Sequence, residues 1–249
     1  MWTYNMDTRL YQFPVSHYCE KARWALDYKG VPYKAQTLLP GLHIKKLKPI
    51  VPDSTVPVLQ IRNESIQGSD RIIDYLDAQF PDKPLTPDDP ALQHEVAEWE
   101  NFAANKIGDP LRCFYYHYLL DEPGTLIPLF SEGGPWYSRL LMGIAFNKIK
   151  QRMRAGYKIN QRTAQVAMHV VDKAIGKLEQ HLATRPFMVG ETFTRADLSI
   201  CALLSPLVIP ERGFLKLSSL AVQPLLDYRK ARIHSPVFRW VNTLYNTYR

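Results

Sequence analysis

The chain has 249 residues, of which 46% are hydrophobic and 22% charged, a balance typical of a globular protein with one or two domains. No apolar run approaches the roughly 18–20 residues of a membrane-spanning helix, and the N-terminus lacks the basic-then-apolar layout of a secretory signal. Cys19, Cys113 and Cys201 are widely spaced, which argues against a disulfide framework and for a reducing compartment. We therefore expect a cytoplasmic protein.

The net charge of +7 arises in one part of the sequence. No acidic residue occurs between Glu132 and Asp172. Seven cations fall in this interval: Arg139, Lys148, Lys150, Arg152, Arg154, Lys158 and Arg162. Without these seven, the 24 remaining Lys and Arg balance the 24 Asp and Glu. The basicity is therefore local, so it does not indicate a general nucleic-acid-binding surface, and we expect no nucleic-acid partner.

Short strand-like and helical patterns alternate over the first 80 residues. Strands are predicted at residues 10–13, 32–39, 56–61 and 65–67. Helices are predicted at 17–29 and 69–80, with a short helix or turn at 43–50. The order βαβ followed by ββα predicts a compact α/β domain over residues 1–80.

A proline-rich stretch separates this domain from an all-helical one. Residues 81–90 contain four prolines and predict an interdomain linker. Residues 91–249 are predicted to form the helical domain. Helical periodicity covers 91–120, 135–157, 161–182, 194–207 and a segment near the C-terminus. The stretch LDEPGTLIPLFSEGGP, residues 120–135, is expected to interrupt these helices.

Ser16 and Cys19 stand at the beginning of the first predicted helix. A helix N-terminus leaves N–H groups unpaired and carries a partial positive charge, so it stabilises an anion, to which a hydroxyl can donate a hydrogen bond. A Cys-x-x-Cys pair here would be redox-active, but Ser16 cannot form a disulfide. The arrangement suits an exogenous thiolate. The same pattern also fits a serine that only caps the helix above a core cysteine.

Two further features point to a peptide-like ligand. Pro57 lies directly before a strand, where a cis bond after Val56 would turn the Val56 backbone N–H and C=O outward. Gly68, Ser69 and Asp70 open a second helix, whose N-terminus suits a carboxylate. Two anion sites beside an exposed strand edge predict a receptor for a short extended peptide that carries a carboxylate and a thiolate.

Five segments in chain order resemble the cytosolic glutathione transferases, closest to the serine-type, theta-like classes. They are LYQFPVSHYCEKARWAL, GLHIKKL, VPVL, GSDRIIDYL and GETFTRADLSI. The last resembles a helix-capping box made by Thr194 and Asp197. The resemblance implies a thioredoxin-like N-terminal domain followed by a C-terminal helical bundle that carries a pocket for a small-molecule electrophile. It also implies glutathione as co-substrate, a homodimer, and detoxification. No metal is expected, because the histidines lack metal-ligand spacing.

The resemblance also implies roles for individual residues, with Ser16 as the catalytic serine that holds the thiolate. The glutathione-binding positions are Tyr18, His43, Lys46, Val56, Pro57, Ser69 and Asp70. Of these, His43 is the first candidate for the glycine carboxylate and Lys46 the second. The electrophile pocket is expected to include Phe114, Tyr115, Tyr116 and Tyr118, although core or dimer packing would explain these aromatics equally well. Two departures, Gly68 and His17, imply weaker glutathione binding or a different thiol.

Several alternatives stay open at this point. Tyr11 could replace Ser16 as the thiolate donor, as in tyrosine-type classes. Cys19 could make the protein a glutathione-dependent reductase through a mixed disulfide. The protein could also be a non-catalytic, glutathione-transferase-like binding or scaffold protein. Residues 136–158 join an apolar run to a basic one, which suits weak contact with an anionic membrane or a helix packed on the bundle with a solvated basic face.

Overall fold

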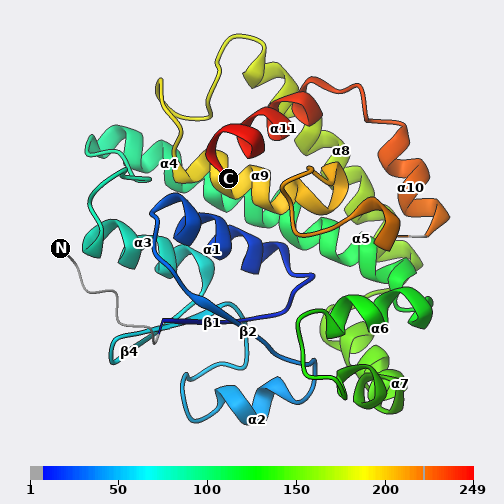
Figure 1. Cartoon of the computed structure of the whole chain (residues 1–249). Coiled ribbons are helices and arrows are strands. Elements are labelled where there is room, and N and C mark those ends of the chain that lie inside the picture. The colour runs from blue at the N-terminus through cyan, green and yellow to red at the C-terminus, as the bar shows by residue number, and fades with distance from the viewer. Residues whose placement is uncertain (1–7, 221) are drawn as a thin grey trace.

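The computed structural model describes residues 8–220 and 222–249. Residues 1–7 of the predicted N-terminal domain lie outside the described residues. They include most of the N-terminal segment that is expected to lack a secretory signal. The chain folds into an N-terminal thioredoxin-like α/β domain and a helical C-terminal region (Figure 1), so the predicted fold class is confirmed.

A four-stranded mixed sheet forms the centre of the N-terminal domain. Its strands are β1 (Arg9–Gln12), β2 (Lys34–Thr37), β3 (Val58–Ile61) and β4 (Glu64–Gln67), in the order β2-β1-β3-β4. β1 is parallel to β2, and β3 is antiparallel to both β1 and β4. The domain's helices are α1 (His17–Tyr28), α2 (His43–Leu47) and α3 (Ser69–Gln79). α1 and α3 lie on one side of the sheet and α2 on the other (Figure 1).

Alternation along β1 explains how the sheet separates two cores. Because successive side chains point to opposite faces, Leu10 joins the main core and Tyr11 joins a smaller one. The smaller core consists of Tyr11, Leu38, Leu47, Val51 and Val58. The Tyr11 hydroxyl donates a hydrogen bond to Gln60 Oε1 at 3.1 Å.

The predicted linker is tightly bound to both parts of the molecule. Leu85 is fully buried, and its backbone N–H donates to Asp77 Oδ1 at 3.0 Å. Its carbonyl accepts from the Arg195 N–H at 2.8 Å. The linker therefore connects α3 to the helical region at a fixed position. Asp89 caps the next helix by accepting from the Ala91 N–H.

The C-terminal region consists of helices throughout its described part. They are α4 (Pro90–Phe102), the π-helix η1 (Ala103–Gly108), α5 (Asp109–Leu119), α6 (Pro123–Ser131), α7 (Ser138–Gly156), α8 (Gln161–Leu182), α9 (Arg195–Val208), the 3₁₀-helix η2 (Leu217–Ser219), α10 (Gln223–Lys230) and α11 (Pro236–Tyr248). α4, η1 and α5 form one continuous run. Pro110, which has no N–H and whose ring clashes with the carbonyl four residues earlier, accounts for the wider π turn.

The prediction that residues 120–135 interrupt the helices was wrong at its centre, where α6 forms. Pro123 occupies the first turn of α6, where its missing N–H costs nothing. The apolar side chains of Leu126, Leu129 and Phe130 are buried, and α6 packs against α7. The prolines and glycines of this stretch indicate a loop. Burial of the apolar face of α6 stabilises the helix by more than these residues destabilise it. In Figure 1, α6 and α7 lie together at the edge of the molecule near α2.

Two side-chain contacts and packing on α9 hold α1 against the helical region. The Trp24 indole N–H donates to the Tyr248 carbonyl at 2.9 Å, and Lys21 pairs with Glu100 of α4 at 2.7 Å. The first helical turn of α9 is fixed by the predicted capping box, in which Thr194 and Asp197 satisfy each other's backbone N–H groups. α1 and α9 pack along one another, so the start of α1 is held in a defined position relative to both domains.

Candidate functional site

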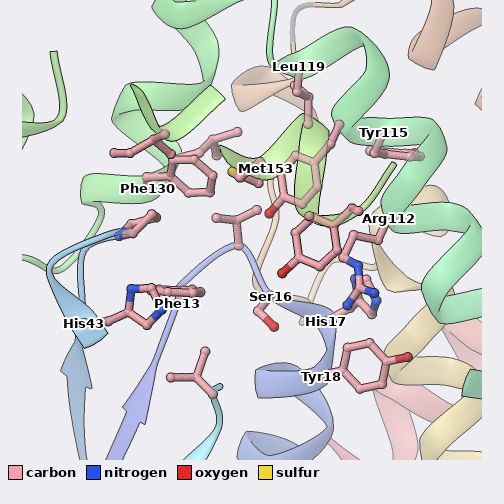
Figure 2. A pocket seen from close by; sticks show the side chains of 18 of the residues that line it. Phe13, Ser16, His17, Tyr18, His43, Arg112, Tyr115, Leu119, Phe130 and Met153 are labelled. Carbon is pink, nitrogen blue, oxygen red and sulfur yellow. The ribbon is translucent and has the colours of Figure 1, made fainter. Parts of the chain in front are cut away.

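A cavity of about 480 Å³ lies between the N-terminal domain and the helical region. Its N-terminal wall comes from the start of α1, the loop before α2 and the loop before β3, and its opposite wall from α5, α6 and α7. In the view of Figure 2, Ser16 stands between His43 on one side and His17 with Arg112 on the other. The cavity therefore joins a polar rim from one domain to an apolar wall from the other.

Ser16 is the N-cap of α1. It has extended backbone angles, and its Oγ accepts a hydrogen bond from the Cys19 N–H at 3.2 Å. A hydroxyl that accepts one hydrogen bond retains its proton for donation, to the Cys19 sulfur or to a ligand in the cavity. The partial positive charge of the α1 N-terminus acts on the same space. The half-buried Ser16 can thus stabilise an anion in the cavity.

The Val56–Pro57 peptide bond is cis, as the sequence predicts, and Val56 lines the cavity. The Gly68 N–H donates to the Pro57 carbonyl at 3.0 Å, which holds the start of α3 beside this loop. Gly68 has a φ of 98°, a conformation that favours glycine. Ser69 is buried beside it and does not line the cavity.

Asp70, in the first turn of α3, is also outside the cavity lining. Its side chain is 64% exposed and forms an ion pair with Lys21 of α1. Partial burial would raise the pKa of the Asp70 carboxyl, but the Lys21 ammonium and Arg195 outweigh this effect and lower it. The ion pair links the N-termini of α1 and α3, the two predicted anion sites.

His43 lines the cavity, whereas Lys46 is exposed on α2 and does not. The Gly41 N–H donates to His43 Nδ1 at 3.0 Å, which leaves Nε2 to carry the proton of the neutral ring. Burial lowers the pKa of His43 against the opposing hydrogen bonds of Leu39 and Ser54. The ring is therefore neutral at pH 7, and it can donate to a ligand only in exchange for one of these backbone hydrogen bonds.

Tyr18 lines the cavity, and its hydroxyl donates to Asp109 Oδ1 at 2.8 Å. Burial, followed by the Asp109 carboxylate, raises the pKa of Tyr18. Gly108 permits this contact, because a Cβ at that position would lie 2.8 Å from the Tyr18 hydroxyl and 3.1 Å from Leu203. The η1–α5 junction therefore approaches α1 as closely as a glycine allows.

His17 and Arg112 form a second polar group that the sequence did not identify as a site. His17 is buried, and burial, with the nearby Arg112 charge, lowers its pKa to about 3 against a hydrogen bond to the Gly108 backbone. Arg112 pairs with Asp109 at 2.9 Å and stacks on Tyr157, its guanidinium carbon 4.4 Å from the ring centroid. Both residues line the cavity.

One face of α5 supplies much of the apolar wall. Its lining residues are Leu111, Arg112, Tyr115, Tyr116 and Leu119. The spacing of 112, 115, 116 and 119 follows one side of a helix. Of the aromatic cluster predicted here (Phe114, Tyr115, Tyr116 and Tyr118), Tyr115 and Tyr116 line the cavity. Phe114 lies on another face of α5 and packs on Tyr228, with ring centroids 4.8 Å apart, and Tyr118 packs edge-on against Phe114. Both positions correct the prediction.

α6 and α7 complete the wall with residues that sequence reasoning missed. They are Leu129, Phe130, Ile149, Arg152, Met153, Gly156 and Tyr157. Across the whole lining there are two arginines, Arg112 and Arg152, and no Asp or Glu. The cavity is thus apolar with a positive bias.

The two alternative sulfur-handling residues fit the cavity poorly. Tyr11 faces the smaller core on the α2 side of the sheet and does not line the cavity. Cys19 is fully buried, and burial raises the pKa of its thiol against the opposing effects of Arg23 and Ser16. A buried thiol with a raised pKa is a weak nucleophile.

Residues 10–84 match the family model of the glutathione S-transferase N-terminal domain. This match supports the glutathione transferase superfamily. A glutathione S-transferase of Pseudomonas putida is 25% identical over 193 residues, which cover 78% of this chain and 71% of that protein.

Solved structures of a beta-etherase and of a glutathione S-transferase share the fold of this chain. A beta-etherase of Sphingobium has a TM-score of 0.63 at 19% identity, with 95% of this chain and 98% of that chain covered. A glutathione S-transferase of Methylobacterium radiotolerans, in complex with glutathione sulfonate, has a TM-score of 0.57 at 19% identity, with 93% and 92% covered.

Residues 8–220 and 222–249 contain neither a metal-binding cluster nor a membrane-spanning helix. No three His, Cys, Asp or Glu side chains converge there in a group that could hold a metal ion. None of the helices of this part is both long and apolar enough to cross a membrane.

Proposed function

We propose that the protein is a serine-type glutathione transferase, in which Ser16 donates a hydrogen bond to the thiolate of glutathione. The observation that carries this proposal is the position of Ser16, which stands at a helix N-terminus and in the lining of a mostly apolar cavity. The thiolate attacks an electrophile held against α5 and α7. Catalysis then rests on an activated nucleophile and on proximity.

Glutathione lies extended along the N-terminal wall in this proposal. The Val56 backbone pairs with its cysteinyl unit, and Ser69 and Asp70 hold its γ-glutamyl end. The Gly68–Pro57 hydrogen bond supports this arrangement, because it keeps the start of α3 next to Val56. His43 donates to the glycine carboxylate from within the cavity lining. Lys46 remains a second candidate for that carboxylate.

The free energy required of the site is modest. A free thiol titrates near pH 8.5, so lowering its pKa by about two units needs about 2.7 kcal/mol of preferential thiolate stabilisation. A hydrogen bond to a charged group contributes about 1.5–3 kcal/mol, and a helix N-terminus about 0.3–1 kcal/mol. Ser16 and the N-terminus of α1 therefore suffice without a buried cation beside the sulfur.

The cavity also favours one class of electrophile. The rings of Tyr115, Tyr116 and Phe130 suit an apolar or aromatic body, and Arg152 has no carboxylate partner among the described residues. An aromatic electrophile with a carboxylate or other anionic group fits this combination best.

The proposal is tested by titrating the protein with glutathione in a calorimeter and by assaying conjugation of an activated aryl chloride. We expect saturable binding with one site per chain and thiol-dependent turnover. Absence of both would overturn the assignment and favour the non-catalytic alternative. The homodimer and the cytoplasmic location implied by the family are part of the proposal, and sedimentation velocity together with localisation of a tagged protein tests them.

A further inference from the structure

Helix α7 has two apolar faces, of which only one is buried. Its inward face packs through Met142, Phe146 and Ile149. On its outward face Leu140 is 64% exposed and Ile144 is 76% exposed, and Trp136, just before the helix, is 91% exposed. The spacing of four residues places Leu140 and Ile144 along one line of the helix surface, and Trp136 lies in the turn that precedes the helix. Large apolar residues arranged this way in solvent mark an interaction site rather than scattered exposure.

Cations lie along the same segment, and most of them form no ion pair with the residues that the structure describes. No acidic residue occurs from 133 to 171. Lys150 and Arg154 pair with Asp121, at 2.6 and 2.7 Å. The other cations of the segment are exposed and form no ion pair with any described residue: Arg139, Lys148, Arg152, Lys158 and Arg162. The outward side of α7 is therefore apolar near its start and basic toward its end.

We propose that the outward side of α7, residues 136–158, docks on the surface of a lipid bilayer that carries anionic headgroups. Trp136, Leu140 and Ile144 enter the boundary between headgroups and acyl chains. The unpaired cations, such as Lys148, lie against the headgroups. An exposed apolar ridge beside unpaired Lys and Arg is the combination that binds such surfaces, and tryptophan is enriched at this depth of a membrane.

Charge argues against a second copy of the chain as the occupant of this face. A symmetric contact through α7 would put the unpaired cations of both copies into one interface, with no acidic residue from 133 to 171 in either copy to balance them. An anionic bilayer supplies the missing opposite charge. The inference is independent of the proposed enzymatic function, since none of Trp136, Leu140 and Ile144 lines the cavity.

Sedimentation of the full-length protein with vesicles tests the docking. We expect it to pellet with vesicles of phosphatidylcholine and phosphatidylserine, not with phosphatidylcholine alone, and to be released as salt screens the headgroups. The double variant Leu140→Gln/Ile144→Gln should lose binding, whereas Val166→Gln, which removes a 57% exposed apolar side chain from α8, should keep it. Arg139→Gln/Lys148→Gln should weaken binding about thirtyfold, since each cation near an anionic surface contributes about 1 kcal/mol, and Lys173→Gln/Lys230→Gln much less.

Tryptophan fluorescence tests the depth of insertion. Brominated phosphatidylserine should quench the wild-type protein, and Trp136→Phe should still bind but lose this extra quenching. Failure to pellet with anionic vesicles, or equal pelleting of the Leu140→Gln/Ile144→Gln variant, would overturn the proposal. Sedimentation velocity without lipid gives a further test. If the wild type self-associates and the double variant does not, a second copy covers this face and the proposal is overturned.

Discussion

The hydroxyl oxygen of Ser16 accepts a hydrogen bond from the Cys19 N–H at 3.2 Å while the same side chain lines the cavity. Ser16→Ala should therefore have two separate effects. Loss of the cap should lower the free energy of unfolding by about 1 kcal/mol. Loss of the donor should raise the pKa of the bound glutathione thiol by about one to two units. Thiolate absorbance measured against pH would report this shift. The same loss should lower kcat/KM at neutral pH about tenfold or more.

A second helix cap separates these effects. Ser235 caps α11 by accepting from the Val237 N–H at 3.2 Å, far from the cavity lining. Ser235→Ala should cost more stability than a cap alone, because Ser235 Oγ also donates to Glu179 Oε1 at 2.6 Å, and it should leave the thiol pKa and kcat/KM unchanged. If Ser16→Ala, like Ser235→Ala, lowers stability and changes neither the thiol pKa nor kcat/KM, Ser16 only caps its helix.

Arg152 determines which electrophiles are accepted, if the cavity binds an anionic group as proposed. Arg152→Gln should raise KM about fivefold for an aryl electrophile with a carboxylate, because an exposed ion pair contributes up to about 1 kcal/mol. KM for a neutral aryl electrophile should not change. Arg139→Gln, on the same helix but outside the cavity, provides the control.

Steady-state kinetics with glutathione as the varied substrate would show whether Arg152 binds glutathione instead of the electrophile. An increase in KM for glutathione with both electrophiles would mean that Arg152 binds a glutathione carboxylate, and would contradict its part in electrophile selection.

Local signals made one wall of the cavity predictable. Ser16 at a strand-to-helix transition and Pro57 before a strand each have a sequence context that limits their backbone, so their positions could be predicted without tertiary information. Tyr11 was a weaker alternative for a reason visible in the sequence. It alternates with Leu10, so only one of the two can face the main core.

The other wall could not be predicted. Arg152 and Met153 reach the cavity only because α6 and α7 fold back toward α2, and no local pattern sets that path. The proline and glycine residues around α6 also hid the helix that supports this wall. Arg112, by contrast, could have been predicted, because it lies three residues before Tyr115 on one helical face. Helical spacing around Tyr115 would have identified Arg112 and removed Phe114, but it keeps Tyr118, which lies three residues after Tyr115 and is absent from the lining because it packs on Phe114.

Gly108 should tolerate no side chain. The Cβ of Gly108→Ala would lie 2.8 Å from the Tyr18 hydroxyl and 3.1 Å from Leu203, so α1 or η1 must move. We expect a loss of about 1–3 kcal/mol in the free energy of unfolding and weaker glutathione binding, measured by urea unfolding and calorimetry. Gly176→Ala, in α8 with nothing near the added carbon, should instead stabilise the protein by about 0.5–1 kcal/mol. Equal behaviour of the two variants would contradict the close approach.

His17 should make stability depend on pH on the acid side of neutrality. Its pKa falls from 6.5 to about 3 in the folded protein, because burial and the Arg112 charge outweigh the Gly108 hydrogen bond. Between these values the unfolded chain binds more protons at this position, so the stability it contributes is complete above pH 6.5 and is lost as pH falls toward 3. From pH 7 to 4.5 the loss should be about 2.7 kcal/mol.

Urea unfolding of the wild type and of His17→Gln at pH 7 and pH 4.5 isolates this contribution, because carboxylates common to both proteins cancel in the difference. Glutamine does not titrate, so His17→Gln should be more costly at pH 7 than at pH 4.5, by roughly 2–3 kcal/mol. An equal cost at both values would mean that His17 takes up its proton as readily in the folded protein as in the unfolded chain. In that case the ring would have to be solvated, or paired with an anion, on the cavity side of α1.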